Sequence, residues 1–412
     1  MKFIHIADLH LDRSFEGLGQ VSKQLLTELS QLNQQLLNNL VDCAIAEKVD
    51  FVLIAGDTFH QPIVTIQTQI NFMRAMTRLE ENQIPVVMSF GNHDYFLPEK
   101  YWFDFPKNIH LFKSETVETI ELMTRAGESV SISGFSYNQR WLKDSKVGEF
   151  PARKKESTYH LGMYHGEQGL AHEQGYAPFK LSELVAKDYD YWALGHIHQR
   201  QVLQREPLII YPGTPLGHSK KEKDETGFLL VELNGKVANY QWQEQHLIQW
   251  LSFSLEVDAE LNQKEILTVL KEKILAAEET TATLSLLEVN LVITPSQLAN
   301  IGQLTTWNRD VLIYLQETVF KASQEKIWPY RLKIKVKAGQ EELPFGVSYD
   351  VLKQLSEQYL APEAFNAMAE DLYRQRELRQ LLSPTEEFRQ QQIQSAQTLL
   401  LQKLGFENEE QK

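Results

Sequence analysis

Cysteine, long apolar runs and net positive charge are all scarce in this chain of 412 residues. The single cysteine, Cys43, excludes a disulfide framework within the chain. No apolar stretch reaches the roughly 18 residues that cross a membrane, and the first apolar run already carries polar residues of a folded domain. We therefore expect a cytoplasmic protein with no membrane segment. Cys43 shares an apolar helical stripe with Leu36 and Leu40, which indicates a core position.

The formal net charge of −14 argues against a protein that coats nucleic acid. Affinity for DNA comes largely from neutralised phosphates, so DNA binding would need local basic patches, metals or a partner. Two basic stretches are candidates, namely Arg140, Lys143, Lys146, Arg153, Lys154 and Lys155, and then Lys220, Lys221 and Lys223.

A third basic feature lies in residues 330–337, where polar and apolar residues alternate strictly. This alternation places four basic side chains on one face of a strand, namely Arg331, Lys333, Lys335 and Lys337. Such a strand is either an edge strand whose charges prevent aggregation or a surface that holds a nucleic-acid backbone.

Five short apolar runs each end in residues that bind metals. Their length and β-branched content predict strands buried on both faces, and in open α/β sheets ligands gather at the carboxyl ends of such strands. The candidate ligands are Asp8, His10, Asp57, Asn92, His165, His196 and His198. We therefore expect these side chains to form one metal centre.

The ligand types indicate the chemistry of this centre. Carboxylates, imidazoles and one amide oxygen, without a thiolate, suit manganese, iron or zinc. Seven candidate ligands exceed what one ion needs, whereas two ions that share one carboxylate would use them well. A two-metal site favours in-line displacement at phosphorus, and hence phosphate-ester hydrolysis. Metal-assisted amide hydrolysis stays open on chemistry alone.

The order of the blocks resembles the calcineurin-like metallophosphoesterase superfamily. The chain contains D-x-H, G-D, G-N-H-D, a lone histidine and G-H-x-H in that family's order. The resemblance implies an α/β fold, a four-layer α-β-β-α sandwich, and two divalent ions, with Mn²⁺ favoured over Fe²⁺ or Zn²⁺. It assigns Asp8, His10, Asp57 and His198 to the first ion, and Asp57, Asn92, His165 and His196 to the second.

The same resemblance implies roles for three further residues. His93 would protonate the leaving oxygen, and Asp94 would hold that imidazole charged and oriented. The block Gly56-Asp-Thr-Phe-His60 and the turn Tyr211-Pro-Gly-Thr-Pro215 are similar to those of the SbcD-type exonucleases, in which His60 would lie against the substrate phosphate. The chain departs from many of these relatives at Asp12, where they have glycine; this carboxylate would lie near the first metal or face water.

Resemblance to the SbcD-type branch implies a Mn-dependent 3′ to 5′ exonuclease with endonuclease activity as a further option. It implies work in DNA repair with an SMC-like, SbcC-type ATPase, and a homodimer as one possible state. Two alternatives remain: a small-molecule or cyclic-nucleotide phosphodiesterase, and a non-catalytic scaffold subunit of an ATPase complex.

We expect three segments along the chain. Residues 1–250 form the catalytic domain, 251–340 an α+β cap domain with a β-α-β-α-β layout, and 341–412 a helical segment that binds the ATPase partner. This last segment carries two apolar helical stripes, namely Phe365, Met368 and Leu372, and then Ile393, Ala396, Leu400 and Leu404. Such stripes usually pack on their own domain, and the resemblance to the SbcD-type family offers binding of the partner ATPase as the second interpretation.

Overall fold

The computed structural model of the chain divides into two compact units. The N-terminal unit comprises Met1–Gln249 and Thr281–Thr283, and the C-terminal unit comprises Trp250–Thr280 and Leu284–Lys412. The expected cap and the expected helical segment therefore fall in the same unit. The structure describes residues 1–18, 21–61, 64–169, 175–222, 226–257, 261–277, 282–294, 297–298, 301, 304–336, 349–370 and 385–406.

The N-terminal unit contains two six-stranded sheets. The first sheet contains four neighbouring parallel strands, in the order β1 (Lys2–Ile6), β2 (Phe51–Ala55), β3 (Val86–Ser89) and β4 (Ile109–Leu111). Two antiparallel strands extend it beyond β1, first β11 (Gly227–Asn234) and then β12 (Val237–Glu244). The second sheet has four parallel strands in its middle, in the order β6 (Ser129–Gly134), β7 (Tyr159–His165), β8 (Tyr191–Gly195) and β10 (Leu208–Tyr211). Each edge is an antiparallel strand, β5 (Glu118–Met123) beside β6 and β9 (Gln201–Arg205) beside β10.

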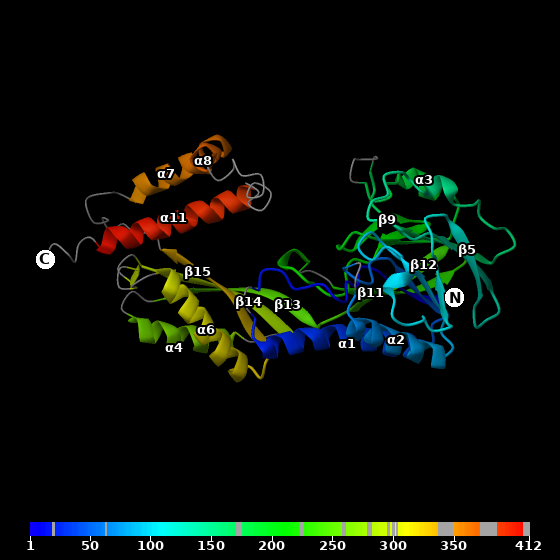
Figure 1. The fold of residues 1–412 in the computed structure, drawn as a ribbon, viewed down its shortest axis with the longest axis horizontal. Helices are drawn as coiled ribbons and strands as arrows, with labels where there is room; N and C mark the ends of the chain where they lie inside the picture. Colours follow the sequence, from blue (N-terminus) through cyan, green and yellow to red (C-terminus); the bar gives the residue numbers. More distant parts are fainter. Residues whose placement is uncertain are drawn as a thin grey trace. The chain divides into compact units, whose positions relative to one another are not determined.

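Alternate residues of these strands supply separate cores, which makes the unit layered. One face of the first sheet packs on α1 (Lys23–Ala46) and α2 (Ile66–Glu81), and its other face packs on the second sheet. The far face of the second sheet packs on α3 (Leu181–Val185) and neighbouring loops. Figure 1 shows α1 and α2 on one side of the sheets and α3 on the other. The predicted four-layer α-β-β-α sandwich is confirmed.

Side-chain caps begin the two long helices of this unit. The hydroxyl of Ser22 accepts the Leu25 N–H, and the hydroxyl of Thr65 accepts the Thr68 N–H, both at 3.1 Å. Cys43 is half-buried and packs against the core below α1. Short 3-10 helices cover Pro98–Lys100, Val147–Glu149 and Lys220–Glu222.

The C-terminal unit begins with the predicted β-α-β-α-β layout. It contains β13 (Ile248–Glu256), α4 (Gln263–Ala276), β14 (Leu284–Ile293), α6 (Leu304–Ala322) and β15 (Ile327–Val336). The strand order is β13-β14-β15, and β14 is parallel to β15. Among the described residues that follow, the helices are α7 (Tyr349–Leu360), α8 (Pro362–Met368) and α11 (Glu386–Phe406).

The basic strand is the edge strand β15 of this unit. Arg331 and Lys333 both lie against Glu288 of β14, at 3.6 and 3.0 Å. Lys335 is exposed, and Lys337 lies outside the described residues. These ion pairs partly neutralise the strand and favour the edge-strand interpretation.

The apolar stripes of the last helices are only partly buried. Phe365 and Ile393 are buried, whereas Met368 and Leu400 are 58% and 49% exposed. Ala396 is also exposed, and Leu372 and the side chain of Leu404 lie outside what the structure describes. Part of each stripe therefore packs on the chain itself, and part of it faces solvent.

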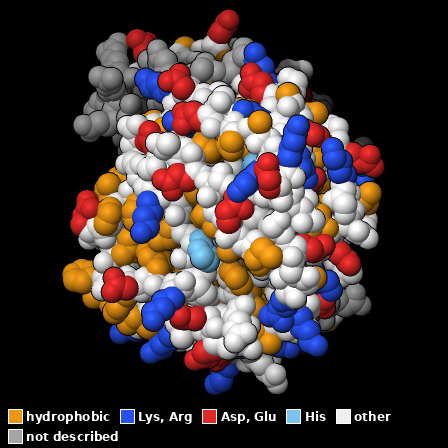
Figure 2. Space-filling model, turned by 90° about the vertical axis from the view of Figure 1, so that its right-hand side faces the viewer, with side chains coloured by type: hydrophobic (Ala, Val, Ile, Leu, Met, Phe, Trp, Pro, Cys, Tyr) orange, Lys and Arg blue, Asp and Glu red, His pale blue; other side chains and the backbone are white. Residues whose placement is uncertain are grey.

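Charges of both signs alternate over the face in Figure 2, where hydrophobic side chains gather around an exposed histidine. Within the described residues, no helix combines the length and apolarity needed to cross a membrane.

Candidate metal centre

The predicted ligands follow the carboxyl ends of strands in both sheets, as the sequence pattern indicates. Asp8 and His10 follow β1, Asp57 follows β2, and Asn92 follows β3. His165 ends β7, and His196 and His198 follow β8. Four of these residues have positive φ angles, namely Asp8 (54°), His10 (45°), Asp57 (51°) and His196 (103°). Non-glycine residues adopt this region at a cost in energy, and such strain clusters at functional sites.

One group of ligands comprises Asp8, His10 and His198, whose ligand atoms lie within 4.8 Å of one another. The Nε2 atoms of His10 and His198 are 3.1 Å apart. Both oxygens of Asp8 accept the backbone N–H of His196, at 3.1 and 3.0 Å. This contact ties the end of β1 in one sheet to the end of β8 in the other.

Asp57 lies between this group and the next. Its Oδ2 atom is 3.7 Å from His10 Nε2 and 3.5 Å from His165 Nε2. Its Oδ1 atom accepts the backbone N–H of His93 at 3.0 Å. The carboxylate, which is 1% exposed, therefore faces ligands of both proposed ions.

The second group gathers around Asn92. Its Oδ1 atom is 3.1 Å from His165 Nε2 and 3.1 Å from His196 Nδ1. Nδ1 of His165 faces the carbonyl of Ala55 at 3.0 Å, so a proton on Nδ1 leaves the Nε2 lone pair for a metal.

The glycines of the metal-binding blocks are needed because the side chains crowd them. A β-carbon on Gly91 would overlap Asp57 Oδ1 and His165 Nε2. Gly56 has a φ of +87°, and a β-carbon there would overlap the His165 ring. These two positions explain the glycine of G-D and that of G-N-H-D in physical terms.

The buried charges of this centre are strongly coupled. Burial opposes ionisation of both Asp57 and His165, but their mutual attraction lowers the pKa of Asp57 overall and raises that of His165 to about 9. Burial raises the pKa of Asp8 to about 6. Divalent ions suit such a set because they supply the positive charge that buried carboxylates need and displace the proton of His165. The residues present therefore fit two divalent ions.

His93 and His60 stack beside the metal ligands. Their ring centroids are 4.5 Å apart with 21° between planes, and each lies 5.1 Å from the ring of His10. Nδ1 of His93 lies 3.1 Å from the carbonyl oxygen of His60. Burial lowers the pKa of His93, although Asp57 opposes the shift.

Asp94 does not have the role expected of it. One of its oxygens accepts the Gly91 N–H at 2.7 Å, and the other accepts the Thr58 and Phe59 N–H groups at 2.8 and 3.3 Å. Burial, followed by the neighbouring Asp57, raises its pKa to about 8. Asp94 therefore joins the loops after β2 and β3, while the partner of the His93 ring is a backbone carbonyl.

Asp12 orients His60. Its Oδ1 atom accepts the backbone N–H of His60 at 2.6 Å, and burial raises its pKa. The carboxylate of Asp12 therefore fixes the loop that carries His60, a contact that the sequence did not indicate, while its position relative to the first metal stays a prediction.

Sequence reasoning missed Glu222, which holds the ring of His198. Its Oε1 atom is 2.6 Å from His198 Nδ1 and accepts a hydrogen bond of 2.6 Å from Arg13. Its Oε2 atom accepts the backbone N–H groups of His218 and Ser219. A carboxylate that binds one nitrogen of a histidine directs the other nitrogen to the metal and makes it more basic. A charged glutamate in a lysine-rich stretch gave no signal of this contact.

Half of the first predicted basic cluster is neutralised by ion pairs. Arg153 pairs with Asp190, Lys154 with Glu121 and Lys146 with Glu149. Lys223 of the second basic stretch lies outside the described residues.

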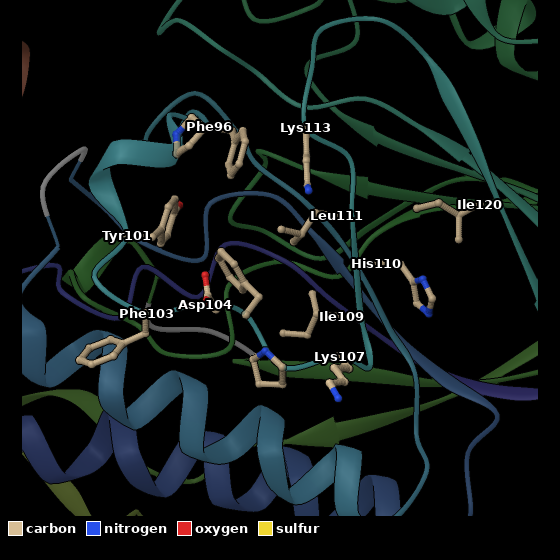
Figure 3. A pocket seen from close by; sticks show the side chains of 13 residues that line it. Phe96, Tyr101, Phe103, Asp104, Lys107, Ile109, His110, Leu111, Lys113 and Ile120 are labelled. Atoms are coloured by element: carbon tan, nitrogen blue, oxygen red, sulfur yellow. The ribbon is translucent and has the colours of Figure 1, made fainter.

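Two hollows of the N-terminal unit are of comparable size. One of about 430 Å³ lies beside the predicted ligand His198 and is lined by Arg13, Glu222 and Lys221. The other, of about 530 Å³, lies along β4 and is lined by aromatic and basic side chains that include Phe103, His110 and Lys113 (Figure 3). Of the predicted metal ligands, His198 lines the first hollow and none lines the second.

Comparison with known proteins identifies the family. The model of the calcineurin-like phosphoesterase family matches residues 1–200. The uncharacterized metallophosphoesterase YhaO of Bacillus subtilis is 33% identical over 274 residues, which cover 66% of this chain and 67% of YhaO. The DNA double-strand break repair protein Mre11 of Methanocaldococcus jannaschii is 26% identical, over 57% of this chain and 63% of that protein.

The SbcD component of the nuclease SbcCD of Bacillus subtilis is also similar. It is 25% identical over 258 residues, which cover 54% of this chain and 63% of SbcD. The chain thus spans less than two thirds of the length of Mre11 and of SbcD. Together with the converging ligands, these similarities show that the chain belongs to the calcineurin-like phosphoesterase family and is a metal-dependent phosphoesterase.

Proposed function

We propose that this chain is a manganese-dependent nuclease that hydrolyses DNA phosphodiester bonds in DNA repair, as a 3′ to 5′ exonuclease with endonuclease activity. The observation that carries the proposal is the position of Asp57 between two groups of oxygen and nitrogen ligands. Asp8, His10, Asp57 and His198 would hold the first ion. Asp57, Asn92, His165 and His196 would hold the second.

Bound together, two divalent ions supply a nucleophile from water at neutral pH and neutralise charge on the attacking and leaving oxygens. Mixed carboxylate and imidazole ligands without thiolate favour Mn²⁺, with Fe²⁺ or Zn²⁺ as alternatives.

His93 would supply the proton that the leaving oxygen takes up. With a proton on Nδ1 donated to the His60 carbonyl, Nε2 is the nitrogen left for the substrate. Burial keeps the free imidazole largely neutral, and an arriving phosphodiester anion raises its pKa toward the value that a proton donor needs. His60, stacked on His93 and fixed through Asp12, would lie against the substrate phosphate.

DNA is the proposed substrate because the names of two relatives indicate action on nucleic acid. Mre11 is named for double-strand break repair, and SbcD is named as part of a nuclease. The net charge of −14 leaves little general affinity for phosphate, so the metals must provide much of the attraction to the scissile phosphate. A partner that binds DNA would add to it.

An SMC-like, SbcC-type ATPase is the proposed partner, and the last helices are its proposed binding surface. Leu355 and Tyr359 of α7 are 44% and 39% exposed, and Met368 and Leu400 are exposed on α8 and α11. Exposed apolar side chains on neighbouring helices are typical of a protein-binding surface. Removal of residues 341–412 should abolish co-purification with the ATPase and leave hydrolysis of a generic phosphodiester intact.

The decisive assay incubates the full chain with end-labelled single-stranded and duplex DNA, with and without Mn²⁺, beside the Asp57→Asn variant. We expect metal-dependent shortening that the variant lacks, and the labelled end gives the polarity. Hydrolysis of bis(p-nitrophenyl) phosphate without cleavage of either DNA, with or without the ATPase, would reject the nuclease proposal and favour a small-molecule or cyclic-nucleotide phosphodiesterase.

A further inference from the structure

A row of adjacent, tilted rings leads from the surface of the N-terminal unit to His196, a predicted metal ligand. The ring of Tyr176 lies 4.6 Å from that of His196, with 37° between planes. Trp141 lies 5.0 Å from Tyr176, with 40° between planes. The guanidinium carbon of Arg140 is 5.2 Å from the centroid of the Trp141 ring. Arg140 is exposed, and both aromatic residues are partly exposed.

The backbone beneath this row is fixed, so its aromatic rings do not sit on free loops. Leu142 pairs with Tyr176 as an isolated β-bridge, and the Ala177 N–H donates to the Leu142 carbonyl at 2.7 Å. Leu142 and Ala177 are both buried in the core outside the second sheet. The carbonyl of Tyr176 also accepts the Glu167 N–H at 3.1 Å. A ligand that stacks here therefore meets a surface that is already ordered, which favours binding.

The chemistry of the row selects a ligand with a flat ring and a negative charge. Bases stack on aromatic side chains without regard to sequence, and a cation beside the ring attracts the backbone phosphate. The row ends at His196, a predicted ligand of the second ion, so a ligand held on it lies beside the proposed site of hydrolysis. A nucleotide offers both groups, because its base can stack on Trp141 while its phosphate faces the preceding residue, Arg140.

We infer that Trp141 is a stacking platform for an unpaired nucleobase next to the phosphate that is cleaved, with Arg140 beside the backbone. A base inside a duplex has both faces covered by its neighbours, so the platform cannot accept an internal base of a duplex, and the form of DNA that we infer for it is a single-stranded or frayed nucleotide. The inference rests on the proposed nuclease function and names the form of DNA that its site takes.

The test measures binding of single-stranded oligonucleotides to the full chain in the Asp57→Asn background, which prevents turnover. One oligonucleotide carries 2-aminopurine at its 3′-terminal nucleotide, and its match carries an abasic 3′-terminal nucleotide. We expect quenching of 2-aminopurine on binding, and roughly 5- to 100-fold weaker binding of the abasic oligonucleotide. Trp141→Ala should abolish the quenching and remove the preference for the base, whereas Trp141→Phe should keep part of both.

Trp102→Ala is the matched control, because Trp102 is a tryptophan of the same unit that is 68% exposed and lies outside the stacked row. It should bind both oligonucleotides as the parent does. Metal content and melting temperature of Trp141→Ala must equal those of the parent; if they do not, Trp141→Phe and Trp141→Leu carry the comparison, since they retain bulk and differ in the aromatic ring.

An unchanged preference for the base in variants of Trp141 would overturn the inference. The nuclease proposal would survive that result, because it is tested separately by metal-dependent cleavage in the parent chain with Asp57 intact. A preference of the parent for blunt duplex over single strands, lost in Trp141→Ala, would also overturn it, since the platform would then stack a paired end.

Discussion

The two ends of the metal centre hold their histidines by different means. His165 is fully buried, and its Nδ1 atom faces the backbone carbonyl of Ala55. His198 is 28% exposed, and its Nδ1 atom faces the side chain of Glu222, which is also tied to Arg13. A backbone partner changes only if the fold changes, whereas a carboxylate can be altered by mutation. The first-metal end is therefore the tunable end, and the second-metal end is fixed by the sheets.

Gly91→Ala should have the largest effect, because it disturbs the second-metal end, whose ligands are held rigidly by the sheets. The added methyl group would overlap Asp57 and His165, which cannot move without disturbing two strands. We expect loss of the second metal and no measurable hydrolysis, as measured by bound Mn²⁺ per chain and diester turnover. Gly148→Ala is the control, because open space surrounds that glycine. Two equivalents of metal in Gly91→Ala would show that this end is more adaptable than the structure indicates.

His93→Ala should reduce turnover about 10²- to 10⁴-fold, as expected for loss of a general acid. It should leave metal content unchanged, because His93 contributes only its backbone N–H to Asp57. Parallel measurements of hydrolysis and bound metal separate the two effects. Full turnover in the variant would contradict the role of His93 as proton donor.

Glu222→Gln should weaken the first metal about 10- to 100-fold, as is typical when a partner of a metal-binding histidine is lost. The second metal should keep its affinity, so a two-step Mn²⁺ titration measures the difference directly. Glu149→Gln, which alters an ion pair with Lys146 away from the centre, is the matched control. Equal weakening of both metals would remove the distinction between the two ends.

Acid should weaken the second metal more than the first. The pKa of His165 is raised to about 9, so below that pH the metal must displace a proton from its ring. Apparent affinity at the second site should fall about tenfold per pH unit as pH decreases through this range. Burial lowers the pKa of His198, but its hydrogen bond to Glu222 raises it overall. Metal affinity at the first site should therefore also fall with decreasing pH, but less steeply. Titrations at pH 6, 7 and 8 test the order, and the opposite ranking would contradict it.

Asp12→Ala should have the smallest effect. It removes the acceptor of the His60 backbone N–H and loosens His60 without touching a metal ligand. We expect a several-fold rise in KM for DNA with kcat and metal content nearly unchanged. Loss of a metal would show that Asp12 supports the centre itself.

The sequence predicted the parts of this centre that depend on local order. Buried strands followed by polar residues place ligands at strand ends, and the structure brings all seven together. It could not predict partners that depend on how distant loops meet. Glu222 reaches His198 from a 3-10 helix, and Asp94 bonds backbone N–H groups from the loop of Asp57, because the folding of each loop decides which acceptor comes within reach.

The same distinction applies to the fold. Alternation and apolar runs predicted the buried strands and the β-α-β-α-β layout, since both follow from periodicity along the chain, whereas the four-layer sandwich came from the family resemblance. The exposure of Met368 and Leu400 could not be predicted, because a helical stripe does not say whether its neighbour is the same chain or a partner.

The central claim is that Asp57 bridges two divalent ions. Electron paramagnetic resonance of the full chain during a Mn²⁺ titration tests it most directly. We predict that two equivalents bind and give a spin-coupled Mn²⁺ pair, and that Asp57→Asn loses the coupling. A single bound equivalent, or two equivalents that remain uncoupled in the parent chain, would contradict the account.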